Sequence, residues 1–99
     1  MFFVLLRFSA NKARAGDFMD AHKAWIKRGF DEGVFLLVGT LRPDQGGCVV
    51  AHNTSLADLQ QRVSEDPFVA EDVVRAEILE IAPARVDARL EAVLARAAA

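Results

Sequence analysis

The chain has 99 residues, of which 53% are hydrophobic, and its 12 basic and 14 acidic residues give a net charge of −2. This length predicts one domain, and the charge balance excludes the basic surface that nucleic-acid binding requires. The apolar N-terminal run is too short to cross a bilayer and no lysine-rich amphipathic face accompanies it, so no membrane partner is expected. The single cysteine excludes an internal disulfide and favours a reducing, cytoplasmic location.

The first half of the chain predicts a strand, a helix and a β-hairpin, in that order. The helix is expected over residues 17–32, with Asp17 as its N-cap and Gly33 as a left-handed stop. The segment "RPDQGG" has the proline and glycines of a turn and would join the two strands of the hairpin. The predicted strands are residues 2–8, 34–41 and 48–53.

The second half predicts a helix, a strand and a final helix. Ser55 is a predicted N-cap with Asp58 as its capping-box partner, and Pro67 would end the helix that they open. Residues 73–81 form the fourth predicted strand, and residues 86–97 the last helix. The order β-α-β-β-α-β plus a C-terminal helix is that of the α+β, ferredoxin-like split βαβ fold.

The strands predict an assembly as well as a fold. Two helices can cover only one face of the sheet, yet the strand over residues 34–41 is apolar at almost every position. We therefore expect the second face to be covered by the same face of a second subunit, as a homodimer. The last helix is a further candidate cover, either over that face or across the dimer.

His22 lies in the apolar stripe of the first predicted helix, among Phe18, Trp25 and Ile26. A histidine in such a place is commonly a packed residue that bonds a backbone carbonyl. It can also be a base whose tautomer is fixed by a carboxylate. The candidate carboxylate is Asp66, although Asp before Pro is also the N-cap signature of a short helical turn. One oxygen can serve the cap and leave the carboxylate free for the histidine.

Other side chains could contribute to a site. Arg7 and Arg75 are charged residues in apolar strands, and they either hold an anionic group or pair with an acid such as Glu77. Cys48 is expected to be a small buried hydrophobe, and His52 to be exposed at a strand end. The chain has no glycine-rich phosphate loop, so no nucleotide cofactor is expected.

A metal site is not expected either. It could be assembled only from His22, His52 and Asp66, which lack the local spacing of metal ligands. The predicted partners are therefore a second copy of the chain and a small organic molecule.

Three segments together resemble the YciI-like family over about residues 2–84. They are "HKAWIKRGFDEGVFLLVGTL", "SLADLQQRVSEDPFV" and "IAPARVD". The shared elements are a histidine on the first helix, a second strand that is led by glycine, and Asp-Pro-aromatic after the second helix. They fall on His22, on Gly33 and Gly39, and on Asp66, Pro67 and Phe68. The resemblance implies one YciI-like domain over residues 1–99, with residues 84–99 outside the match, and a dimeric α/β-barrel arrangement.

The resemblance also implies a His–Asp active site, which assigns catalytic roles to His22 and Asp66. Trp25, Phe68, Arg7 and Arg75 are then the candidate substrate-binding residues. The chain departs from many relatives at Thr40, where they carry proline after glycine. Relatives also often have an arginine shortly before the histidine, whereas the nearest one here is Arg14. These departures predict a different pocket rim.

Two functions fit these residues. The first is a small cofactor-independent enzyme that uses the His–Asp pair for elimination, isomerisation or hydrolysis on a small organic molecule. The second is a non-catalytic dimeric module that binds a small ligand or assists another protein. The fold does not choose between them, because ferredoxin-like domains support both.

Overall fold

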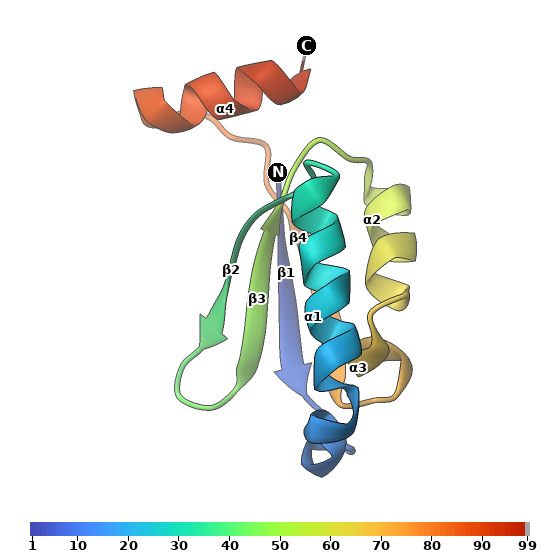
Figure 1. Cartoon of the computed structure of the whole chain (residues 1–99). Helices are drawn as coiled ribbons and strands as arrows, with labels where there is room; N and C mark the ends of the chain where they lie inside the picture. The colour runs from blue at the N-terminus through green and yellow to red at the C-terminus, as the bar shows by residue number, and fades with distance from the viewer. Residues whose placement is uncertain (99) are drawn as a thin grey trace.

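The computed structural model describes residues 1–98, with side chains described through Leu94, so Ala99 of the predicted domain lies outside the described part. One four-stranded antiparallel sheet is covered on one face by helices (Figure 1). Its strands are β1 (Phe2–Phe8), β2 (Phe35–Leu41), β3 (Gly46–Ala51) and β4 (Val74–Glu80). The helices are η1 (Lys12–Arg14), α1 (Ala15–Asp31), α2 (Leu56–Ser64), α3 (Pro67–Ala70) and α4 (Ala88–Ala98).

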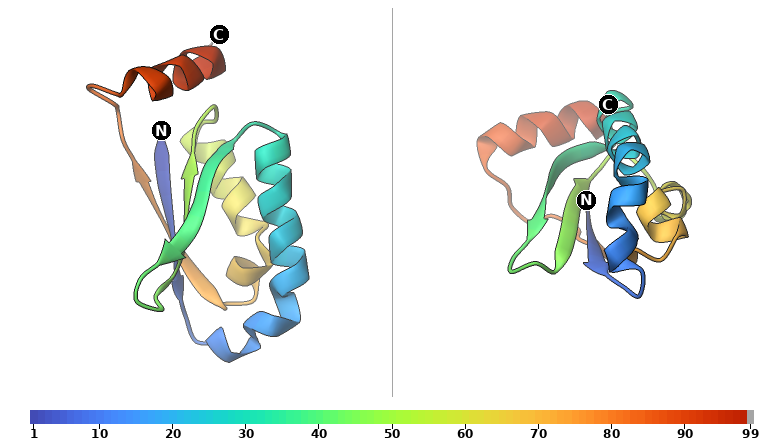
Figure 2. Two further views of the ribbon diagram at one scale, coloured as in Figure 1. Left: turned by 60° about the vertical axis from the view of Figure 1, so that its left-hand side comes forward. Right: turned by 60° about the horizontal axis from the view of Figure 1, so that its bottom comes forward.

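The strand order β2-β3-β1-β4 is that of the ferredoxin-like fold, so the predicted fold class is confirmed. Hairpin β2–β3 inserts β3 beside β1, and β4 adds to the other edge of β1. The two central strands, β1 and β3, are therefore separated in sequence by α1 and β2. This arrangement places α1 and α2 together on one face (Figures 1 and 2).

Helix boundaries differ from the sequence prediction at three places, one of which is α4, because it begins at Ala88 and not at residue 86. The N-cap of α1 is Arg14, not Asp17, and the helix begins at Ala15 because the 3-10 turn η1 leads into it directly. Gly33 ends this region with φ +75°, as predicted. Ser55 caps α2 by accepting from the Asp58 amide at 3.1 Å. Pro67 does not end α2 but opens the separate turn α3.

The core lies between the sheet and α1, α2 and α3. Val4 and Leu6 of β1 and Val49 of β3 are buried, and they meet Trp25 and Leu59 of the helices. Phe35 packs edge-on against Trp25, with ring centroids 5.1 Å apart. Gly29 of α1 allows this approach, because a Cβ at that position would overlap the Phe35 ring.

The second face of the sheet is uncovered in the single chain. Leu37 of β2 and Leu79 of β4 are 54% and 44% exposed. A register shift between Phe35 and Leu37 moves Leu37 to this face and turns Val38 toward the helices. Helix α4 lies beyond the end of the sheet where the chain begins, so it does not cover this face within one subunit (Figure 2).

His52, expected to be exposed, is 8% exposed at the end of β3. Its backbone N–H donates to the Val34 carbonyl at 2.9 Å, which draws the residue under the start of β2. The side-chain Nδ1 has no hydrogen-bond partner among the described residues. Burial lowers the pKa of His52, a backbone contact with Gly33 opposes the shift, and the N-terminal ammonium adds to it.

The two helical glycines provide a matched test of packing. We expect Gly29→Ala to lower the free energy of unfolding by about 1–3 kcal/mol, because the Phe35 ring must move in a filled core. A Cβ added at Gly16 would meet no atom within 4 Å, so Gly16→Ala should raise stability by about 0.5 kcal/mol through helix propensity. Urea denaturation measures both. Equal effects of the two substitutions would contradict the packing argument.

His52 should make stability depend on pH. Its lowered pKa in the folded state means that the unfolded chain binds the proton more tightly. The contribution of neutral His52 to the free energy of unfolding is therefore fully present above the pKa of this histidine in the unfolded chain. It is lost as the pH falls below that value. From about pH 7.5 to about pH 5.5, the melting temperature of the unmodified protein should fall further than that of His52→Gln. Since His22 is common to both proteins, identical pH profiles would refute this role of His52.

Candidate active site

Helix α1 carries His22 on the side that faces the sheet and α3. Trp25 and Gly29 on the same side are buried, and Met19 and Ile26 are partly buried against the core. This is the apolar stripe that the sequence predicted. The side chain of His22 is 12% exposed, so it is neither solvent-exposed nor sealed in the core.

Asp66 connects α2 to α3 and caps α3. Its backbone is extended, Pro67 follows as the first helical residue, and its Oδ1 accepts from the Phe68 amide at 3.0 Å. The hydrogen bond from the Phe68 amide fixes the direction of the Asp66 carboxylate relative to the start of α3. The residue is 0% exposed.

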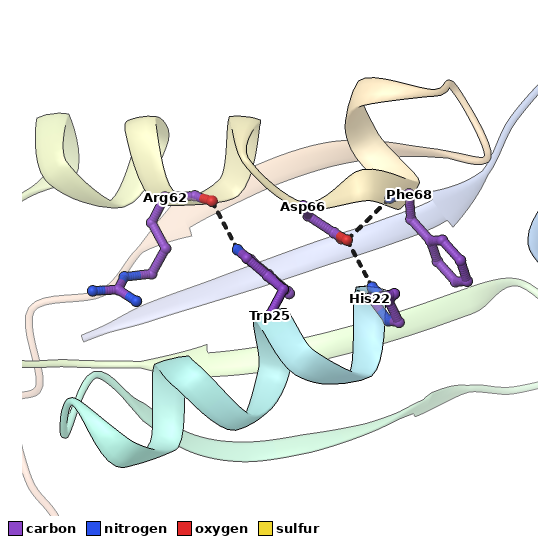
Figure 3. Close-up of polar contacts among 5 residues, drawn as sticks. All are labelled: His22, Trp25, Arg62, Asp66 and Phe68. Carbon is purple, nitrogen blue, oxygen red and sulfur yellow. Dashed lines mark hydrogen bonds and ion pairs between the residues drawn. The ribbon is translucent and has the colours of Figure 1, made fainter. Parts of the chain in front are cut away.

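The same oxygen of Asp66 lies 2.7 Å from Nδ1 of His22, which confirms the predicted contact (Figure 3). When Asp66 is ionised its carboxylate only accepts hydrogen bonds, so Nδ1 then donates its hydrogen to Oδ1. The lone pair of the neutral ring is then on Nε2, for which no partner is found among the described residues. Oδ2 of Asp66 is buried and likewise has no partner in the part of the chain that is described.

Aromatic rings fix the plane of the imidazole. The Phe68 ring stacks on His22 with centroids 3.9 Å apart and an interplanar angle of 4°. Trp25 lies at 5.9 Å and 22° from the imidazole, and its Nε1 donates to the Arg62 carbonyl at 2.9 Å (Figure 3). Phe68 thus holds the pair twice, through its amide on Asp66 and its ring on His22.

His22 and Phe68 line an open pocket of about 520 Å³ between α1 and the hairpin end of the sheet. Most of its wall is apolar and comes from β1, α1, β2 and β4. These residues are Leu6, Phe8, Met19, Ile26, Val38 and Val74. A larger hollow of about 620 Å³ lies where the segment 83–86 meets α4, away from His22.

The structure does not bring the other predicted substrate-binding residues to this pocket. Arg7 and Arg75 lie on the uncovered face of the sheet, because side chains alternate along a strand and Leu6 and Phe8 take the pocket side. Arg7 forms an ion pair with Glu77, which was the alternative interpretation. Trp25 is buried behind His22 and supports the ring without lining the pocket.

Lys23 and Thr40 line the pocket. Thr40 is one of the departures from relatives that predicted a different pocket rim, whereas no pattern in the sequence marked Lys23 as a site residue. Lys23 is the next residue after His22, so its side chain leaves α1 about 100° further around the helix. This direction puts it at the edge of the pocket. Thr40 reaches the pocket because the register shift in β2 changes which side chains face α1. The hairpin turn also contributes Asp44, Gly46 and Gly47.

Cys48 is half-buried on β3, and burial raises the pKa of its thiol. No group of three or more His, Cys, Asp or Glu side chains is arranged to hold a metal ion within residues 1–98. Across the same range, no helix has the length and hydropathy needed to cross a membrane.

The comparisons with known proteins agree with this fold. The family model of the YCII-related domain matches residues 1–82. A similar solved structure is that of 5-chloro-2-hydroxyhydroquinone dehydrochlorinase (TftG) from Burkholderia phenoliruptrix AC1100, in complex with 2,5-dihydroxybenzoquinone. It has a TM-score of 0.66 and 15% sequence identity, over 83% of this chain and 94% of that one. No curated protein sequence matches the chain. Because the family model spans most of the sequence, the resemblance is confirmed and the chain belongs to the family of YCII-related domain proteins.

Proposed function

We propose that the protein is a small acid/base enzyme in which Nε2 of His22 exchanges a proton with a small organic ring compound. The observation that carries the proposal is the 2.7 Å contact between Nδ1 of His22 and Oδ1 of the buried Asp66, at the wall of an open pocket. Proton transfer needs only a positioned imidazole, so the proposal invokes no cofactor.

His22 is the proposed catalytic residue and Asp66 the positioning residue. Asp66 keeps the hydrogen on Nδ1 and stabilises the imidazolium that forms when Nε2 accepts a proton. Phe68 keeps the ring from rotating away from the carboxylate, since its ring lies parallel to the imidazole at 3.9 Å. The apolar wall would exclude water from the substrate.

Elimination is the reaction that we favour among those open to such a pair. The structurally similar TftG is a dehydrochlorinase, and loss of a proton together with chloride is a reaction that a base promotes. In this chain Nε2 would take the proton, the leaving group would depart with its bonding electrons, and the imidazolium would return the proton to solvent. A 5-chloro-2-hydroxyhydroquinone is therefore the first substrate to test, with chloride release as the readout.

The uncovered sheet face supports the further proposal that the protein is a homodimer. Leu37 and Leu79 are exposed there, and Arg7 and Glu77 pair on the same face. A second copy would remove this apolar area from water, which is how a chain of this size commonly gains stability.

The catalytic proposal predicts different outcomes for two substitutions of His22. In His22→Asn the side-chain amide can replace Nδ1 as donor to Asp66, so the fold should persist while kcat falls by about 10²–10⁴-fold. His22→Ala should also lower the free energy of unfolding by about 1–3 kcal/mol, because a buried carboxylate loses a donor. Turnover and urea denaturation measure these effects. Full activity of His22→Asn would reject His22 as the catalytic residue, whereas no turnover by the unmodified protein would favour the binding module.

Asp66→Asn tests the positioning role separately. Asn is also a good N-cap, so α3 should form, but the neutral amide can either accept from or donate to Nδ1. We expect the imidazole to populate both tautomers, which ¹⁵N chemical shifts of the ring report, and kcat to fall. A single unchanged tautomer together with unchanged kcat would contradict the role.

The dimer proposal predicts that Leu37→Glu yields monomers, because it puts a charge on the uncovered face. Gln61→Glu, at an exposed position on α2, is the matched control and should leave the dimer intact. Light scattering during size exclusion measures the mass. An unmodified protein with the mass of one chain would contradict the proposal.

A further inference from the structure

The pocket beside His22 has an unbalanced charge. Apart from the histidine, its charged lining residues are Lys23 and Asp44. Asp44 is already neutralised, since its Oδ2 lies 2.8 Å from Nζ of Lys12. Among the described residues Lys23 takes part in no ion pair. The pocket wall therefore has one positive charge without a partner in the described part of the chain.

The position of Lys23 relates this charge to the proposed base. It is the next residue after His22 on α1, and although successive side chains diverge around a helix, both residues line the same pocket. Lys27, one turn later, differs because its Nζ lies 2.6 Å from Asp31 and it does not line the pocket. Lys23 is therefore a cation that lines a cavity, whereas Lys27 is a cation that pairs on the helix surface.

From this placement we infer that the pocket binds a small organic monoanion, with Lys23 as the residue that selects for the charge. The inference rests on the proposed function and specifies its substrate class: a one-ring compound that carries an ionised hydroxyl or a carboxylate. A volume of about 520 Å³ is enough for one ring with substituents. The flexible four-carbon stem of lysine lets the ammonium reach an anion that lies against the apolar wall of the pocket.

The other charges in the pocket limit the ligand to one negative charge. At the hairpin end Lys12 is not available to a second anionic group, because its ammonium is already engaged by Asp44 and by the Phe8 ring at 4.5 Å. An uncharged ring would leave the ammonium of Lys23 with water alone as its partner. Charge complementarity thus favours the monoanion over both alternatives.

The effect of removing Lys23 should be moderate. The residue is exposed, so solvent screens the interaction with the anion and an effect near tenfold on the dissociation constant is expected. The substitution leaves the apolar contacts of the ring in place, so an uncharged probe of the same shape should be unaffected.

The test uses 4-nitrophenolate as the anionic probe and 4-nitroanisole as its uncharged counterpart. Binding is followed by the NMR shifts of the His22 and Phe68 rings, at a pH where the phenol is ionised. The unmodified protein should bind 4-nitrophenolate more tightly, and Lys23→Gln should weaken that binding about tenfold without changing that of 4-nitroanisole. Lys27→Gln is the matched control and should alter neither. Added salt should weaken phenolate binding to the unmodified protein but hardly affect Lys23→Gln.

Two results would overturn the inference. One is the absence of any preference for 4-nitrophenolate over 4-nitroanisole in the unmodified protein. The other is a preference that survives Lys23→Gln. Failure here is distinguishable from failure of the proposed function, because the probes undergo no reaction. A Lys23-dependent preference combined with full activity of His22→Asn would keep the charge selection and reject the acid/base role.

Discussion

The site depends on one carboxylate oxygen that is shared by two donors. Oδ1 of Asp66 accepts from the Phe68 amide at 3.0 Å and from Nδ1 of His22 at 2.7 Å. The first bond is local and exists because Asp-Pro opens a helical turn. The second joins α3 to α1, which are 44 positions apart in sequence at these residues. A buried carboxylate is costly without donors, so the orientation of the short helix and that of the imidazole stabilise each other.

The fold and the ends of several elements could be predicted from the sequence, because short local patterns of residues determine them. The ferredoxin-like order follows from hydrophobic periodicity and turn residues, and Ser55 and Gly33 act as the cap and the stop that their residue types predict. The His22–Asp66 contact needed more than periodicity. It followed from the resemblance to a family, together with the rule that both helices of a split βαβ unit pack on one face.

What could not be predicted depends on long-range register. The shift between Phe35 and Leu37 has no distinctive residue, yet it decides that Val38 and Thr40 face the helices while Leu37 faces outward. In a strand that is apolar at almost every position, the sequence does not show which alternate side chains face the helices. The burial of His52 likewise depends on a bond from its backbone to Val34, a residue on the far side of the hairpin. Local patterns do not contain that information.

The division of the pocket among elements has an evolutionary consequence. The His22–Asp66 contact is made by α1 and the start of α3. Part of the opposite pocket wall belongs to hairpin β2–β3, whose tip contacts η1 through the exposed ion pair between Lys12 and Asp44. Substitutions in the hairpin can therefore change the shape of the cavity while the His22–Asp66 contact stays in place. A scaffold divided in this way can bind new ligands after changes in one loop, which makes that loop the natural segment to randomise in a directed-evolution library.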